Sequence, residues 1–272
     1  MRSLKHTRRH FQSLAVGALL FAFACATRAQ QRHTAPLRVA AAADLQFALK
    51  DIGQQYEHQT GHKVELTFGS SGNFFAQLQN GAPFDVFFSA DMQYPTRLQQ
   101  ANLTEPNSLA KYAVGRIVIW MPAGSNVDLA AQKWNALLDS AVQKIAIANP
   151  EHAPYGRAAV EALKRAGLYD DVQPKLVYGE NISQAAQFVQ SGNAQAGIIA
   201  LSLAISPAMK SGQLWEIPVD QYAPIEQAAV VLKNAQDKDG AHQFLKFVSS
   251  DAGQRTLGTY GFAIPNGAAP SR

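Results

Sequence analysis

Apolar and polar positions in the first part of the chain follow one another as strands and helices in turn. Leu37–Ala43 is apolar apart from Arg38 and reads as a buried strand, and the segment after it repeats apolar residues on one helical face. Val64–Phe68 alternates apolar with polar residues, the period-2 pattern of a strand with two unlike faces, and Asp85–Ser89 reads as a short buried strand. This order predicts an α/β lobe with a mostly parallel sheet.

The longest β-prone run, Tyr112–Met121, is interpreted as the strand that leaves this lobe. Strands and helices alternate again until Gln227–Leu232, which reads as a return strand, and Gly240–Tyr260 is then helical. We therefore predict two α/β lobes with a ligand cleft between them, the second inserted into the first. Lobe 1 comprises residues 37–115 and 222–272, and lobe 2 comprises residues 116–221.

Several strand-to-helix turns are rich in hydrogen-bond donors. After Gly69, Asn73 is expected to open a short helix. The carboxyl ends of parallel strands bind ligands in open α/β sheets, and the N–H groups of a helix N-terminus suit a small oxyanion, which offers only acceptors. The plainer alternative is that the serines cap their own helices. The turns are Ala43-Asp44, Ser70-Ser71, Pro154-Tyr155-Gly156 and Asn181-Ile182-Ser183.

The N-terminal segment has the pattern of an export signal. Basic residues precede the apolar run Leu14–Ala26, which is too short to span a bilayer and is followed by small residues. We predict a signal peptide at residues 1–29, and Thr7–Phe11 is similar to a twin-arginine signal. The single cysteine, Cys25, lies inside it, and the residues before it make a poor lipoprotein box, which argues against a lipid anchor.

Export changes the meaning of the charge. The formal net charge of the 272 residues is +4, and removing the five basic residues of segment 1–29, which has no acidic ones, leaves −1. The charge balance therefore gives no support for nucleic-acid binding. A mature chain without cysteine is held by its core alone in the oxidising periplasm.

Five runs of the chain carry a resemblance to a known family. They are AAAADL (40–45), FGSSG (68–72), GAPFDVFFSAD (81–91), NPEHAPYG (149–156) and YGF (260–262). Together they resemble the periplasmic molybdate-binding proteins, the solute receptors of molybdate ABC transporters, and the similarity extends from about Leu37 to Ile264. The resemblance implies a type II two-lobe fold that closes on molybdate or tungstate and docks on a membrane permease, with no enzymatic activity and no cofactor, and we expect a monomer.

The resemblance also implies a set of ligand-binding residues. The first-strand serine of the family falls on Asp44, and its second hydroxyl ligand falls on Ser71. The turn after the PEHAP run falls on Tyr155, and a backbone N–H at the next helix start falls on Ile182. A tyrosine found in some members falls on Ala200, so that contact is absent here, and Tyr155 brings a phenol that can replace it.

Asp44 is the departure that matters most, because a carboxylate repels a dianion unless it points away or carries a proton. One interpretation is that Asp44 caps its helix and offers only its backbone N–H to the ligand. The other is that it accepts a proton from a hydrogen oxyanion such as phosphate or arsenate.

Two alternatives to a molybdate receptor stay open. The ligand could be another tetrahedral oxyanion, sulfate or phosphate. From a different class, the chain could be a periplasmic serine hydrolase that uses Ser71 with His152, although Ser71 lies in no G-x-S-x-G elbow. A cation site at His58 and His62 is not expected, because Gly61 interrupts the helix that would align them. There is no phosphate-loop motif, so the transporter ATPase must be another polypeptide.

Overall fold

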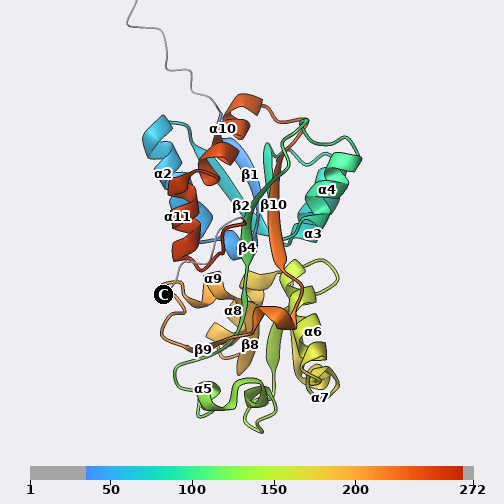
Figure 1. Cartoon of the computed structure of the whole chain (residues 1–272), viewed down its shortest axis with the longest axis vertical. Helices are drawn as coiled ribbons and strands as arrows, with labels where there is room; N and C mark the ends of the chain where they lie inside the picture. The colour runs from blue at the N-terminus through green and yellow to red at the C-terminus, as the bar shows by residue number, and fades with distance from the viewer. Residues whose placement is uncertain (1–34, 266–272) are drawn as a thin grey trace, which may run out of the picture. The chain divides into compact units, whose positions relative to one another are not determined.

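The computed structural model describes residues 35–265, in which ten strands form two five-stranded sheets (Figure 1). The predicted signal peptide lies outside the described residues. The first sheet has the order β2-β1-β3-β10-β4 and the second the order β7-β6-β8-β5-β9. The first contains β1 (Leu37–Ala42), β2 (Val64–Gly69), β3 (Val86–Ser89), β4 (Ala110–Gly115) and β10 (Ile225–Val231). The second contains β5 (Ile117–Met121), β6 (Ile145–Ala148), β7 (Leu176–Gly179), β8 (Ala196–Ala200) and β9 (Gln213–Glu216).

The two sheets share one pattern of pairing. In the first, β1 is parallel to β2 and β3, while β10 is antiparallel to β3 and β4. In the second, β6 is parallel to β7 and β8, while β5 is antiparallel to β8 and β9. Parallel and antiparallel pairs are therefore equal in number. The predicted two-lobe α/β fold is confirmed, but the prediction of mostly parallel sheets is wrong, because β10 and β5 each pair antiparallel with both of their neighbours.

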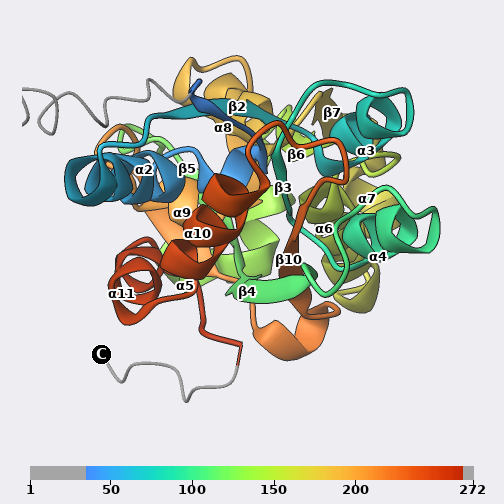
Figure 2. The ribbon, with the colours of Figure 1, turned by 90° about the horizontal axis from the view of Figure 1, so that it is seen from above.

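Alternate residues of the strands in the first sheet reach opposite faces, as the pleat requires. Leu37, Val39 and Ala41 are buried with helices α2 (Ala48–Thr60), α10 (Lys238–Val248) and α11 (Asp251–Thr259). Ala40 packs on the other face with α3 (Ser71–Gln79) and α4 (Gln93–Gln100). Viewed from above, α2, α10 and α11 lie on one side of the strands and α3 and α4 on the other (Figure 2).

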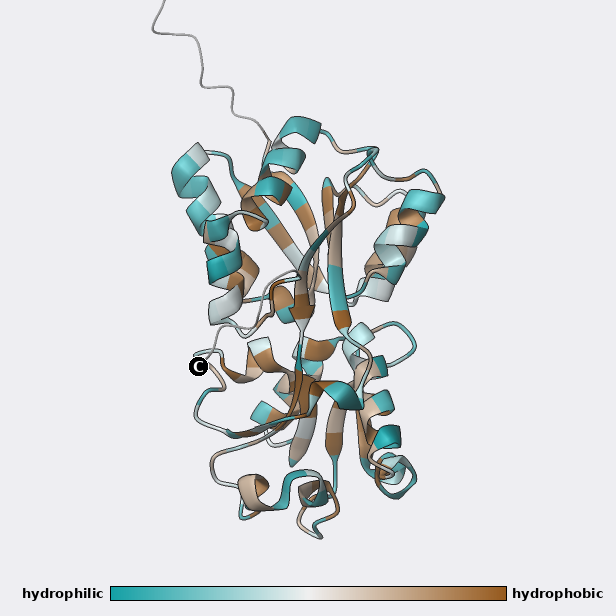
Figure 3. Ribbon diagram, viewed as in Figure 1, coloured by the Kyte–Doolittle hydropathy of each residue, from teal (hydrophilic) through white to brown (hydrophobic). Residues whose placement is uncertain are grey.

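The second sheet has a single continuous core. Helix α8 (Ile182–Gln190) packs on β6, β7 and β8, and α6 (Pro154–Arg165) packs on β6, β8 and β5. The strands are mostly apolar and the outward faces of the covering helices mostly polar (Figure 3). Shorter elements complete this half: α5 (Leu129–Gln132), α7 (Tyr169–Val172), α9 (Leu201–Ala204) and the 3-10 helices Lys133–Leu137, Gln173–Lys175 and Val219–Gln221.

The chain passes between the sheets twice. The run Tyr112–Met121, predicted as one strand, is two strands, because β4 ends at Gly115 in the first sheet and β5 begins at Ile117 in the second. A Cβ at Gly115 would lie 2.1 Å from the Tyr155 hydroxyl, so only glycine fits this point of passage. The second passage runs from β9 through Val219–Gln221 into β10. The lobe boundaries given above stay a prediction.

Among residues 35–265, none of the helices combines the length and the apolar character needed to cross a membrane.

Candidate functional site

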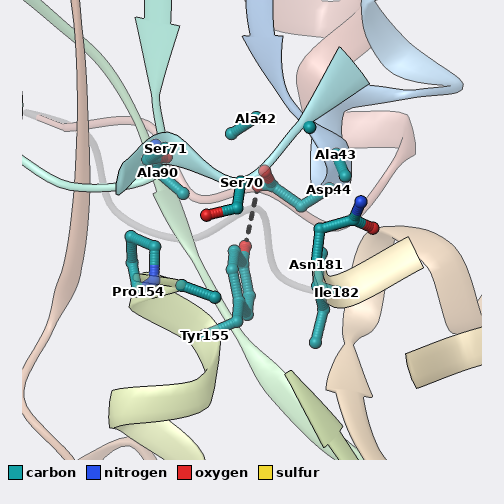
Figure 4. Close-up of a pocket in the computed structure, with 12 residues that line it drawn as sticks. Ala42, Ala43, Asp44, Ser70, Ser71, Ala90, Pro154, Tyr155, Asn181 and Ile182 are labelled. Atoms are coloured by element: carbon teal, nitrogen blue, oxygen red, sulfur yellow. Dashed lines mark hydrogen bonds between the residues drawn. The ribbon is translucent and has the colours of Figure 1, made fainter. Parts of the chain in front are cut away.

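The four donor-rich turns meet at one small cavity between the two sheets (Figure 4). All four residues expected at the ligand, Asp44, Ser71, Tyr155 and Ile182, are among those that line it. Ala200 is fully buried in β8 and is not among them. The lining residues are Ala42, Ala43, Asp44, Gly69, Ser70, Ser71, Ala90, Ala153, Pro154, Tyr155, Asn181 and Ile182.

Strand order explains why distant segments of the chain meet here. β1 and β2 are parallel neighbours, and their carboxyl ends lead into the 3-10 helix η1 (Ala43–Leu45) and into α3. β6 and β7 are parallel neighbours in the second sheet, and their carboxyl ends lead into α6 and α8. The N-termini of α3, α6 and α8 therefore approach one point, with the positive ends of their dipoles toward it.

The hydroxyls of the Ser70-Ser71 turn are used differently from helix capping. Helix α3 begins at Ser71, two residues before the predicted start at Asn73, with Ser70 in the N-cap position. The Ser70 side chain makes no capping hydrogen bond, and the buried Ser71 Oγ accepts from Ala90 N–H at 2.9 Å. Helix capping therefore does not explain either serine.

At α8 the side chain does cap the helix, but incompletely. Asn181 Oδ1 accepts from the N–H groups of Ser183 and Gln184, both at 3.0 Å. The amide of Ile182, the first residue of the helix, is not one of its two donors. This leaves the Ile182 N–H at the edge of the cavity as a donor suited to a ligand.

The Asp44 side chain does not cap a helix, so the capping part of that interpretation is wrong. Asp44 lies within η1, which has no side-chain cap, and it is 1% exposed. Its Oδ2 accepts hydrogen bonds from Gln227 Nε2 at 2.6 Å and from the Tyr155 hydroxyl at 3.0 Å (Figure 4 shows the Tyr155 contact). Its Oδ1 is buried and has no partner within the described residues. One carboxyl oxygen is thus occupied and the other is left to a ligand.

Burial governs the ionisation of this carboxyl group. Loss of hydration raises the pKa of Asp44 from 3.8 to about 6, against the lowering effect of hydrogen bonds from Gln227, from Tyr155 and from the backbone N–H groups of Asp44 and Leu45. Burial, together with the nearby Asp44, also raises the pKa of Tyr155 well above its ordinary value. The phenol is therefore a neutral hydrogen-bond donor at any physiological pH.

Gln227 is a site residue that the sequence reasoning missed. It is fully buried in β10, next to an irregularity of the pairing with β4. Its Oε1 accepts from the Tyr112 hydroxyl at 2.7 Å, while its Nε2 donates to Asp44 Oδ2 and lies 3.0 Å from the Tyr155 hydroxyl. The available signal was an amide next to the buried apolar stretch Ala228–Val231 of the strand. Gln227 links the returning strand to both lobes of the site.

The structure pairs His152 with Ser70 and not with Ser71. Ser70 Oγ donates to the His152 carbonyl at 2.8 Å and lies 2.9 Å from His152 Nδ1. Because the hydroxyl has a single proton, Nδ1 must be the donor in the second contact. A serine activated as a nucleophile needs the opposite arrangement, with the imidazole accepting its proton. The geometry does not favour a serine hydrolase.

The cavity suits a ligand recognised by neutral donors. No lysine, arginine or histidine lines it, and Asp44 and Tyr155 are its only titratable residues. Its free volume is about 10 Å³, which is about the space that one buried water molecule needs. A larger hollow of about 270 Å³ adjoins it and shares Gly69, Ser70 and Asn181 with it.

Hydrogen bonds and an ion pair hold the lobes together around this cavity. Each joins a residue of the first-sheet half to one of the second-sheet half, so the described conformation is a closed one. They are Gly72 N–H to the His152 carbonyl (2.9 Å), Ser183 Oγ to Gln46 Oε1 (2.8 Å), Ser202 Oγ to the Asp44 carbonyl (2.7 Å) and the ion pair of Arg157 with Asp91.

Comparison with known proteins agrees with this arrangement. Residues 37–263 match the bacterial extracellular solute-binding protein family. The chain belongs to this family. It is 39% identical over 252 residues to the molybdate-binding protein ModA of Azotobacter vinelandii, covering 92% of this chain and 96% of that protein. It is 38% identical to ModA of Rhodobacter capsulatus, covering 82% and 86% respectively.

A solved structure extends the likeness to three dimensions. The periplasmic molybdate-binding protein of Azotobacter vinelandii superposes with a TM-score of 0.79 at 35% identity, covering 85% of this chain and all of that one. For an extracellular solute-binding protein, a closed pocket between two sheets is the expected place for the solute. The cavity described above occupies that place.

Proposed function

We propose that this protein is a periplasmic receptor that binds molybdate, and tungstate with it, between its two lobes and delivers the anion to the permease of an ABC transporter. The observation that carries the proposal is the meeting of four donor-rich turns from both lobes at one cavity without a cationic side chain. A fully ionised oxyanion has only acceptors, so a cage of hydroxyl and N–H donors matches it. The names and identities of the relatives supply the choice of molybdate.

The proposed ligands of the anion are Ser71, the backbone of Ile182, and Asp44, while Tyr155 lines the cavity and holds Asp44 Oδ2 through its hydroxyl proton. The helix N-termini behind them stabilise negative charge without a counter-ion. Binding favours the closed conformation, and the permease then recognises the closed lobes. We infer a monomer that carries no cofactor, catalyses no reaction and binds no nucleic acid.

The test is thermal unfolding of the mature protein with molybdate, tungstate, sulfate or phosphate added separately. A ligand bound by the native state alone stabilises it by about 4 kcal/mol at a thousandfold excess over Kd. We expect a large shift with molybdate and tungstate and little with sulfate. No shift with any of the four would refute the proposal, and a shift with phosphate alone would replace its ligand.

A pair of tyrosine variants locates the site. Tyr155→Phe removes a phenol that lines the cavity, and we expect about 5- to 150-fold weaker molybdate binding from the loss of one buried hydrogen-bonding group. Tyr178→Phe makes the same change at a side chain that is 46% exposed, and its affinity should equal that of the unmodified protein. Equal affinities in both variants would place the ligand elsewhere.

A further inference from the structure

Asp44 is an ionisable group in a site otherwise built from neutral donors, and its two oxygens are in different situations. Oδ2 already accepts from Gln227 at 2.6 Å and from Tyr155 at 3.0 Å. Oδ1 is buried without a partner, in a residue that lines the cavity. A buried carboxylate oxygen without a hydrogen bond is costly, so Oδ1 is the atom at which a ligand or a proton must be accommodated.

The hydrogen-bond directions around Asp44 determine where a proton can sit. Gln227 Oε1 is occupied by the Tyr112 hydroxyl, which orients the amide so that its Nε2 faces Asp44. Nε2 donates to Oδ2 and also lies 3.0 Å from the Tyr155 oxygen, so the Tyr155 proton points to Oδ2. With two donors directed at Oδ2, a proton on the carboxyl group must lie on Oδ1.

We propose that Asp44 binds the oxyanion as a neutral carboxylic acid whose Oδ1–H donates to the anion, so that binding takes up one proton from solvent. This inference rests on the proposed function. The step is balanced: the ionised carboxylate, one solvent proton and the dianion give the carboxylic acid hydrogen-bonded to the dianion. The acid hydroxyl then supplies a hydrogen-bond donor to the anion at this position. It also removes the repulsion between two negative groups in a desolvated site.

The groups that face Asp44 leave it as the site of proton uptake. From α6 and β4 they are Tyr155 and Tyr112, whose pKa values burial raises well above the ordinary value, so both stay neutral. From β10 and α9 they are the uncharged Gln227 and Ser202. The pKa of Asp44 itself, about 6 by burial, makes protonation accessible near neutral pH. His152 does not line the cavity but contacts Ser70, which does, so it is the second group to test as the site of proton uptake.

The experiment is calorimetric titration of the mature protein with molybdate from pH 5 to 8, in buffers of different ionisation enthalpy. Buffer dependence reports the number of protons taken up. We expect about one proton per anion at pH 8, with affinity falling about tenfold per pH unit above pH 6 and levelling off below it. Unchanged affinity from pH 6 to 8 without proton uptake would overturn the inference and leave the receptor function intact.

Two variants identify the group responsible. Asp44→Asn is the neutral isostere: its amide oxygen can accept from Gln227 and Tyr155 while its NH₂ donates to the anion. We expect it to bind molybdate with a pH-independent affinity and no proton uptake. His152→Asn should keep the proton uptake of the unmodified protein. The reverse result, with uptake kept in Asp44→Asn and lost in His152→Asn, would assign the proton to the imidazole and refute the inference.

Phosphate separates a failure of this inference from a failure of the proposed function. Monohydrogen phosphate brings its own proton, so ionised Asp44 can accept it, and its binding at pH 8 should show no proton uptake. Phosphate binding that exceeds molybdate binding at pH 8 and is lost in Asp44→Asn would mean that the natural ligand is a hydrogen oxyanion. Absence of molybdate binding at pH 6 in the unmodified protein would refute the receptor function itself.

Discussion

Gly72 lies where the first turn of α3 meets the other lobe, and Gly72→Ala should weaken ligand binding by hindering closure. Its N–H donates to the His152 carbonyl at 2.9 Å. A Cβ at this position would lie 2.6 Å from that carbonyl oxygen, 2.8 Å from the His152 Cβ and 2.7 Å from the Tyr94 hydroxyl. The two His152 atoms belong to the opposite lobe, and one of them is a backbone atom. The clash with them can therefore be relieved only if the lobes part or the helix shifts.

The magnitude follows from the cost of overpacking a tight contact, about 1–3 kcal/mol. If the anion binds to the closed form, this cost appears in full as lost affinity, about 5- to 150-fold. The free energy of unfolding without ligand should fall by less, because the open conformation relieves the clash with His152. Calorimetric titration with molybdate measures the first quantity and urea denaturation the second.

Gly258→Ala is the matched control, because a Cβ there meets no atom within 4 Å and the residue lies in helix α11. We expect unchanged affinity and a gain of about 0.5–1 kcal/mol in stability from the better helix former. If Gly72→Ala binds molybdate as tightly as the Gly258→Ala control does, the contact of Gly72 with His152 is absent from the bound state. The reasoning about closure would then be wrong.

Two further predictions concern the hydrogen bonds of the carboxyl group. Gln227→Met keeps the size of the side chain but removes the 2.6 Å donor to Asp44, so the free energy of unfolding should fall by about 1–3 kcal/mol. The control Gln99→Met, on an exposed helical face, should change the free energy of unfolding little. Equal urea midpoints for the two variants would refute the role of Gln227 as a stabilising donor to Asp44. Because burial raises the pKa of Asp44 from 3.8 to about 6, its contribution to stability is complete below pH 4 and is lost, to the extent of about 3 kcal/mol, as the pH rises through 6. Urea denaturation at pH 4 to 7 should show no such decline in Asp44→Asn, whereas the control Asp170→Asn, at an exposed residue, should keep it. A decline that persists in Asp44→Asn would mean that the Asp44 carboxyl is not the group that titrates.

The elements of the fold were largely predictable, because each strand carries its own apolar pattern and ends at a local signal. The run before Asp44 forms β1 and is buried except at Arg38, and the donor-rich turns lie where strands lead into helices. The predicted lobe boundary falls inside Tyr112–Met121, but local pattern could not indicate that this run is two strands in two sheets. Both halves of that run are β-prone, and the break at Arg116 follows from where the second sheet lies.

The sequence by itself indicated four of the residues that line the cavity. Asp44, Ser71, Tyr155 and Ile182 each follow a strand, and parallel strands of one sheet place their carboxyl ends together. The tertiary structure alone decided what these side chains contact. Asp44 and Gln227 are 183 positions apart, and Ser70 and His152 are 82 apart, so no local pattern relates them. A carboxyl that reads as a helix cap is instead held at one oxygen by the returning strand, because burial requires partners and only the fold supplies them.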